Sequence, residues 1–166
     1  MAVTGAWHSR TGASAGTIGS AITSIVFGGS SDTAGTAAAD PITAGNNSIK
    51  RFFVIRFTET TTSTATLSNV KIDRSDSAGS GAVLDGAGAT EVDAKQGETY
   101  GQNVTTPITA TSTALQASGA NSIALTASAP VGSTSDSQQF AVQVDTGTGA
   151  TAGVGFTLRC SFDITV

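Results

Sequence analysis

Residues 154–166 alternate apolar and polar side chains without a break. Successive side chains of a strand point to opposite faces of a sheet, so this pattern predicts a long strand with one buried and one wet face. A helix is excluded for this segment, because its apolar positions would recur every 3.6 residues. The predicted inward row is Val154, Phe156, Leu158, Cys160, Phe162, Ile164 and Val166.

Composition extends this expectation to the whole chain. Thr, Ser, Ala and Gly make up more than half of the 166 residues, whereas Lys, Glu, Met and Leu are scarce. Thr and Val favour pleated surfaces, and no window shows a sustained helical period with caps. With 39% apolar residues gathered in strand-length runs, the chain does not resemble a disordered coil. We therefore predict a single all-β domain.

Two internal segments give the clearest further strands. Residues 48–58 carry apolar side chains on both faces, which predicts a central strand that is covered on both sides, by the chain itself or by a partner. Residues 64–72 also alternate, but the alternation slips between Leu67 and Val70. A slip of one residue indicates a β-bulge near Ser68 and Asn69.

The remaining strand candidates are shorter or more polar. We expect residues 138–145 to pair with 154–166 as a hairpin with a long loop. The other candidates are residues 21–27, 82–84, 99–106, 108–116 and 121–127. About seven to nine strands joined by turn-rich loops predict an antiparallel β-sandwich or jelly roll over residues 21–166.

Residues 1–20 are predicted to form an extended, small-residue N-terminal arm that holds the chain's one Trp and one His. Trp7 either folds back onto its own domain, anchors in a neighbouring subunit, or belongs to a loosely packed terminus. No acidic residue adjoins His8, which we expect at the surface. We take Trp7, His8 and Arg10 as candidate residues for contact with another protein subunit.

Groups that carry chemistry are few. One Cys and one His exclude a zinc site, and we expect no catalytic residues, no metal and no cofactor. Asp73 and Asp76 are expected in a solvated turn, with a calcium site as the alternative. Cys160 has apolar neighbours at period two and is predicted to be a small core residue.

Charge and hydropathy restrict the partners. The net charge is −4 and the basic residues are dispersed, so we expect no direct contact with nucleic acid. The apolar stretches are too short to cross a bilayer, and the first residues lack a signal-peptide pattern, so synthesis in the cytoplasm is expected. With one Trp and one Tyr, Tyr100, an aromatic sugar-binding cleft is not expected.

The order of turns and strand ends resembles that of small structural proteins of tailed bacteriophages. In the first half, a turn of Pro, Ile, Thr, Ala and Gly leads into an aromatic and basic strand and then a Ser-Asn-Val-Lys segment. In the second half, the similarity lies in a segment that begins with Thr-Tyr and ends with Thr-Thr-Pro, and in the last two predicted strands. The matching residues are 41–45, 47–57, 68–71, 99–107, 111–112, 139–144 and 156–163.

This resemblance implies a virion structural role without catalytic residues. The implied function is that of a decoration, or cement, protein on the outer capsid surface, made in the host cytoplasm. The implied partners are the major capsid protein and further copies of this chain, with a trimer as one option. A tail, neck or fibre protein and a receptor- or glycan-binding adhesin domain remain alternatives.

Overall fold

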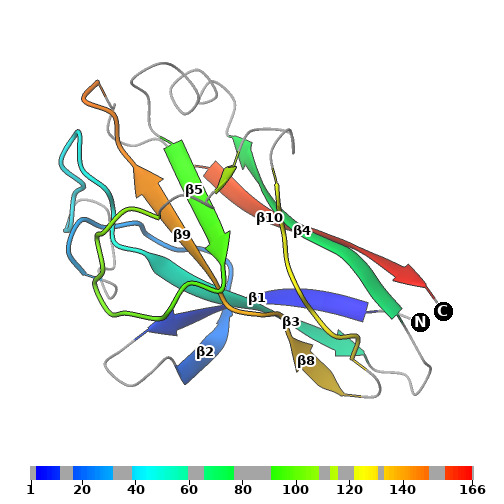
Figure 1. Cartoon of the computed structure of the whole chain (residues 1–166). Helices are drawn as coiled ribbons and strands as arrows, with labels where there is room; N and C mark the ends of the chain where they lie inside the picture. The colour runs from blue at the N-terminus through cyan, green and yellow to red at the C-terminus, as the bar shows by residue number, and fades with distance from the viewer. Residues whose placement is uncertain are drawn as a thin grey trace.

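A computed structural model describes residues 3–11, 17–31, 39–59, 66–76, 91–108, 113–115, 122–130, 133–149 and 156–165. All regular structure within these ranges is β-structure, in two antiparallel sheets (Figure 1). The predicted all-β, sandwich-like fold class is therefore confirmed. No helix in the described ranges is long and apolar enough to cross a membrane. The predicted strand at residues 82–84 lies outside the described residues.

The larger sheet has seven strands in the order β2-β1-β3-β9-β5-β6, and β8 pairs with β3 beside β9. All of its pairings are antiparallel. Its strands are β1 (Val3–Thr11), β2 (Thr17–Ile22), β3 (Arg51–Glu59), β5 (Glu91–Gln96), β6 (Thr113–Ala114), β8 (Thr134–Asp136) and β9 (Phe140–Asp145).

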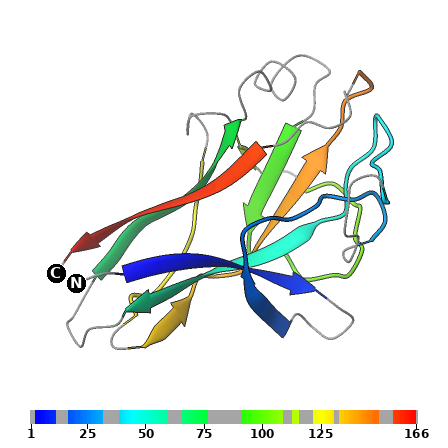
Figure 2. The same ribbon diagram turned by 180° about the vertical axis from the view of Figure 1, so that it is seen from behind.

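The smaller sheet has three strands in the order β10-β4-β7, namely β10 (Phe156–Thr165), β4 (Thr66–Asp76) and β7 (Ile123–Ala124). It forms a second layer over the larger sheet, as both views of the molecule show (Figure 2). The long strand predicted from the C-terminal alternation is thus confirmed. Its predicted hairpin with residues 138–145 is wrong, because β9 pairs with β3 and β5 whereas β10 pairs with β4.

β3 is the central strand of the molecule, as its two apolar faces predicted. Seven of its nine residues are buried, including the cationic Arg51. One face, with Phe53, joins the main core between the sheets. The opposite face, with Phe52, packs under Ile108 and Tyr100, whose ring centroid lies 5.1 Å from that of Phe52. The chain itself therefore covers both faces of this part of the strand.

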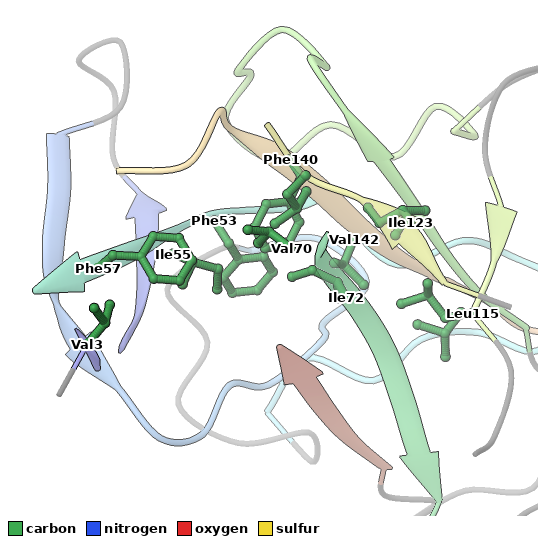
Figure 3. Packing of buried hydrophobic residues seen from close by; sticks show 13 residues of the cluster. Val3, Phe53, Ile55, Phe57, Val70, Ile72, Leu115, Ile123, Phe140 and Val142 are labelled. Atoms are coloured by element: carbon green, nitrogen blue, oxygen red, sulfur yellow. The ribbon is translucent and has the colours of Figure 1, made fainter. Parts of the chain in front are cut away.

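The main core lies between the two sheets (Figure 3). The larger sheet contributes aromatic and aliphatic side chains of β3, β5 and β9, and the smaller sheet contributes those of β4 and β7. The fully described members are Val3, Phe53, Ile55, Phe57, Val70, Ile72, Val92, Ala94, Leu115, Ile123, Leu125, Phe140 and Val142. Four inward side chains of β10, namely those of Phe156, Leu158, Cys160 and Phe162, pack against this core and remain partly exposed.

The predicted bulge in the fourth strand is confirmed. Along β10, Ser161 pairs with Lys71 and Asp163 pairs with Ser68, so two residues of β4 lie opposite one residue of β10. Asn69 in this step has φ of 51°, a left-handed conformation that Asn tolerates better than most residues. The extra residue lets the apolar side chains on either side of the bulge face the core.

Other predicted strands are shorter or absent. Residues 23–28, the greater part of the candidate at 21–27, have no strand structure, and neither do residues 99–106. The candidate at 121–127 is reduced to the two residues of β7. Of the candidate at 108–116, β6 is the part that forms a strand in the described residues.

β8 was not predicted and continues the line of β9 along β3. Ser137 separates the two strands and bonds to Ile55 twice. Its N–H donates to the Ile55 carbonyl at 2.8 Å, and its hydroxyl accepts from the Ile55 N–H at 3.0 Å. A side chain thus replaces one backbone group of the ladder at this irregular step.

Candidate interaction surface

The described part of the predicted arm belongs to the larger sheet. β1 pairs with β3 over eight consecutive residues, from Val3 opposite Glu59 to Arg10 opposite Phe52. The structure places Trp7, His8 and Arg10 in this strand, where successive side chains point to opposite faces. Trp7 consequently faces the core, whereas His8 and Arg10 face the outer side of the larger sheet.

Trp7 folds back onto its own domain, which was one of the three expectations for it. Its ring makes edge contacts with Phe53 and Phe140, at centroid distances of 5.8 and 5.7 Å. Edge-to-face contacts of this kind add to the free energy gained by burial alone. In this position the Trp7 ring contributes to the packing of the sandwich.

His8 is buried, so its prediction as a surface histidine is wrong. Its side chain is 8% exposed, and Nδ1 lies 2.8 Å from the carbonyl oxygen of Gly19 in β2. An N–H at Nδ1 donates to that carbonyl, and the bond ties the edge strand β2 to β1. The sequence separation of eleven residues hid this contact, because nothing local to His8 indicates a hairpin across residues 11–17.

Arg10 begins a chain of polar contacts on the outer side of the larger sheet. Its guanidinium donates to the side-chain oxygen of Gln139, and the Gln139 amide donates to the carbonyl of Glu98 at 2.7 Å. The Glu98 carboxylate then accepts from Lys50 and pairs with Lys95, each at 2.8 Å. These hydrogen bonds and ion pairs hold the pKa of Glu98 below its usual value.

Arg56 forms a bidentate ion pair on this outer side. Its Nε and Nη2 atoms donate to the two carboxylate oxygens of Asp136 at 2.7 and 2.8 Å. The bonds from Arg56 lower the pKa of Asp136, and the charges of His8 and Arg10 lower it further. We call His8, Arg10, Arg56, Glu98 and Asp136 the outer polar network. Both of its carboxylates pair with cations of the same chain.

The outer side of the smaller sheet is a second rigid polar surface. Arg159 in β10 donates through Nε and Nη2 to Asp73 in β4, at 2.8 and 3.0 Å, and Asn69 donates to Asp163 at 2.6 Å. Asp73 therefore lies in a strand, and its predicted position in a turn is wrong. The side chain of Asp76, its partner in the calcium alternative, lies outside the described residues.

Side chains that could serve as metal ligands are scattered. In the described ranges, no group of three or more His, Cys, Asp or Glu side chains is arranged to hold a metal ion. Burial, aided by the charge of Asp73, raises the pKa of the Cys160 thiol to about 11. A thiol with so high a pKa is protonated near neutral pH, and its packing against the core agrees with the predicted structural role.

The carboxyl group of Asp93, on the larger sheet, lies in surroundings that disfavour its ionised form. Burial, together with the neighbouring charges of Glu91 and Asp145, raises the pKa of Asp93 to about 6. The unfolded chain would lose this proton near pH 4, so the folded state binds more protons between these values. The contribution of Asp93 to the free energy of unfolding is therefore most favourable below about pH 4 and falls as the pH rises from about 4 to about 6.

We expect Asp93→Asn to stabilise the protein above the titration of Asp93. After allowance for solvent screening, the expected gain is about 1–2 kcal/mol at about pH 8, and it should vanish near pH 4. Urea unfolding at both pH values measures it. Glu91→Gln, which removes one of the repelling charges, should give a smaller gain. An Asp93→Asn gain that is equal at both pH values would contradict this assignment.

Comparisons of the chain with protein-family models, with curated proteins and with solved structures found no significant match.

Proposed function

We propose that this chain is a non-enzymatic virion structural protein that decorates a capsid and stabilises its shell. The proposal rests on the resemblance of its turns and strand ends to small structural proteins of tailed phages. Its partner in this role is the major capsid protein, and its place is the outer surface of the particle. The structural observation that supports it best is the polar outer side of the smaller sheet.

That surface presents small polar and charged side chains from two long strands that pair with each other, β4 and β10. Ser161 and Lys71 are exposed there between the two internally bonded pairs of the surface, and Thr157 is exposed beyond the pair of Arg159 and Asp73. Side chains fixed on strands lose little conformational freedom on binding, so less of the contact energy is offset by ordering. Repetition over a symmetric shell then makes modest individual contacts effective.

A charge reversal at Lys71 tests whether the smaller sheet contacts the shell. Its side chain points outward because Val70 and Ile72 on either side of it are buried. We expect Lys71→Glu to weaken binding to purified shells that lack this chain by about tenfold, because the substitution reverses the charge that attracts the shell. We expect it to change the free energy of unfolding by less than about 0.5 kcal/mol. Co-sedimentation with shells and urea unfolding measure the two effects.

Thr4→Glu is the matched control, since Thr4 is exposed on β1 in the other sheet. It should leave co-sedimentation unchanged. Failure of the unsubstituted chain to bind shells would overturn the proposal, and binding to isolated tails or to glycans would favour the tail or adhesin alternatives. Equal binding of Lys71→Glu and the unsubstituted chain would remove the smaller sheet from the contact.

A further inference from the structure

β10 is a long edge strand. It spans ten residues and, in the described part of the chain, hydrogen-bonds to β4 alone. Edge strands of stable monomers are commonly short or interrupted by Pro, Lys or a bulge, which blocks pairing with another chain. β10 contains neither Pro nor Lys, and the bulge of this pair lies in β4. Figure 2 shows β10 at the margin of its sheet.

The backbone groups that point away from β4 can be assigned. The Leu125 N–H donates to the Val70 carbonyl at 2.8 Å, so Val70 directs its backbone groups toward β7. Backbone direction alternates along a strand, so Lys71 directs its groups toward its partner on β10, which is Ser161. Ser161 in turn points toward β4. The free edge is therefore formed by the N–H and C=O groups of Leu158, Cys160, Phe162 and Ile164.

The outward charges of β10 are symmetric about Ser161. Arg159 precedes it by two residues, and Asp163 follows it by two. In an antiparallel pair of two β10 strands centred on Ser161, Arg159 of each copy lies directly opposite Asp163 of the other. Opposite charges that face each other across an antiparallel pair are stabilising. Both already hold a partner on β4, Asp73 and Asn69, which fixes their position at the edge.

The apolar side of β10 is also incompletely covered and symmetric about the same residue. Its inward side chains are partly exposed, and Ile164, at 38%, is the exposed large hydrophobic residue of the described chain. The pairing centred on Ser161 sets Ile164 opposite Leu158 and Phe162 opposite Cys160. Each exposed apolar side chain thus meets an apolar neighbour.

We propose that two copies of this chain pair through β10, antiparallel and with Ser161 on the two-fold axis. This register agrees with the direction of the free backbone groups. The N–H and C=O groups of Cys160 and Phe162 both point to the free edge, so Cys160 of one copy can exchange hydrogen bonds with Phe162 of the other. Residues 158–164 of the two copies would share about eight backbone hydrogen bonds. The two small sheets then form one continuous six-stranded sheet. This contact does not depend on the proposed role on a capsid.

A mixing experiment tests the charge symmetry. In a dimer of Asp163→Arg, two cations face each other at both positions where residue 159 of one copy meets residue 163 of the other. In a dimer of Arg159→Asp, two anions face each other at the same two positions. Each variant alone is expected to be monomeric in sedimentation equilibrium, with association at least ~10-fold weaker than that of the unsubstituted chain. An equimolar mixture restores both opposite-charge pairs and should form the mixed dimer.

Both variants are first checked for the circular dichroism of the unsubstituted fold, and Asp163→Asn is the substitute where Asp163→Arg fails that check. For Asp163→Asn we expect a smaller loss of self-association, and we expect that loss to depend on the salt concentration. Monomeric unsubstituted protein at its highest soluble concentration overturns the proposal. So does a mixture of the two charge variants that stays monomeric.

Cross-linking tests the position of the axis. Ser161 would face Ser161 of the second copy in a pair without hydrogen bonds between the two residues, where Cα atoms lie about 4.5 Å apart and a disulfide can form. Ser161→Cys combined with Cys160→Ser should therefore give a covalent dimer on mild oxidation. Thr157→Cys combined with Cys160→Ser is the control, since its two thiols would lie roughly 27 Å apart along the strands. Equal cross-linking of the two variants overturns this register.

Discussion

Replacing Trp7 by Ala is expected to lower the free energy of unfolding by about 3 kcal/mol. The indole packs against Phe53 and Phe140, which also contact each other, and both of those rings are buried in the main core. Its removal leaves a cavity that the surrounding strands fill only in part. Partial exposure of Trp7 places the effect at the low end of the range for large aromatic residues. Urea unfolding followed by circular dichroism measures the loss.

Trp7→Phe is the conservative control for this site. It retains most of the buried ring area, and we expect it to cost about 1 kcal/mol. A Trp7→Ala variant with unchanged stability but lost self-association would show that the residue anchors in a second subunit. That result would contradict its place in the core.

Replacing Gln143 by Ala should cost about 2–4 kcal/mol, because it leaves several buried backbone groups without partners. Gln143 is 1% exposed and lies in β9. Its side-chain oxygen accepts from the Ile108 N–H at 2.9 Å, and its amide donates to the carbonyls of Ser48 and Thr105, at 2.7 and 3.2 Å. One side chain thus holds two loops against the outer side of the larger sheet.

Gln138→Ala is the matched control, because Gln138 is exposed and its side-chain oxygen accepts from the amide of Gln96. We expect that variant to lie within about 0.5 kcal/mol of the unsubstituted chain. Thermal and urea unfolding of both variants give the comparison. Similar losses for the two would mean that the buried bonds of Gln143 contribute no more than a surface contact.

The position of Gln143 shows where local pattern stops being informative. Residues 138–145 alternate, which places Gln143 on the face opposite Val142 and Val144, and its bonds to Thr105 and Ile108 agree with this. A face that carries Gln side chains would ordinarily meet water. Residues 98–108, however, cross that face and bury it. These residues were predicted to include an edge strand, because their Thr and Val content suits β-structure whether or not a neighbouring strand is present.

The candidate contact residues were limited in the same way. Sequence composition placed Trp7, His8 and Arg10 in an arm, since small residues surround them and no long alternation is visible. What makes β1 a strand is its pairing with β3, whose buried residues lie more than forty positions away. Arg56 and Asp136, the best ion pair of the outer polar network, are separated by 80 residues and carried no sequence signal.

The C-terminal strand separates the two kinds of information most clearly. Its alternation alone determined that residues 156–165 form a strand with an apolar and a polar face, because the pleat fixes a period of two wherever the strand lies. The sequence alone also contained the slip that became the bulge of β4. Only the tertiary structure decided that β10 lies beside β4 and at the margin of its sheet. Side-chain periodicity specifies a face, whereas strand neighbours are chosen by backbone hydrogen bonds and core packing between distant segments.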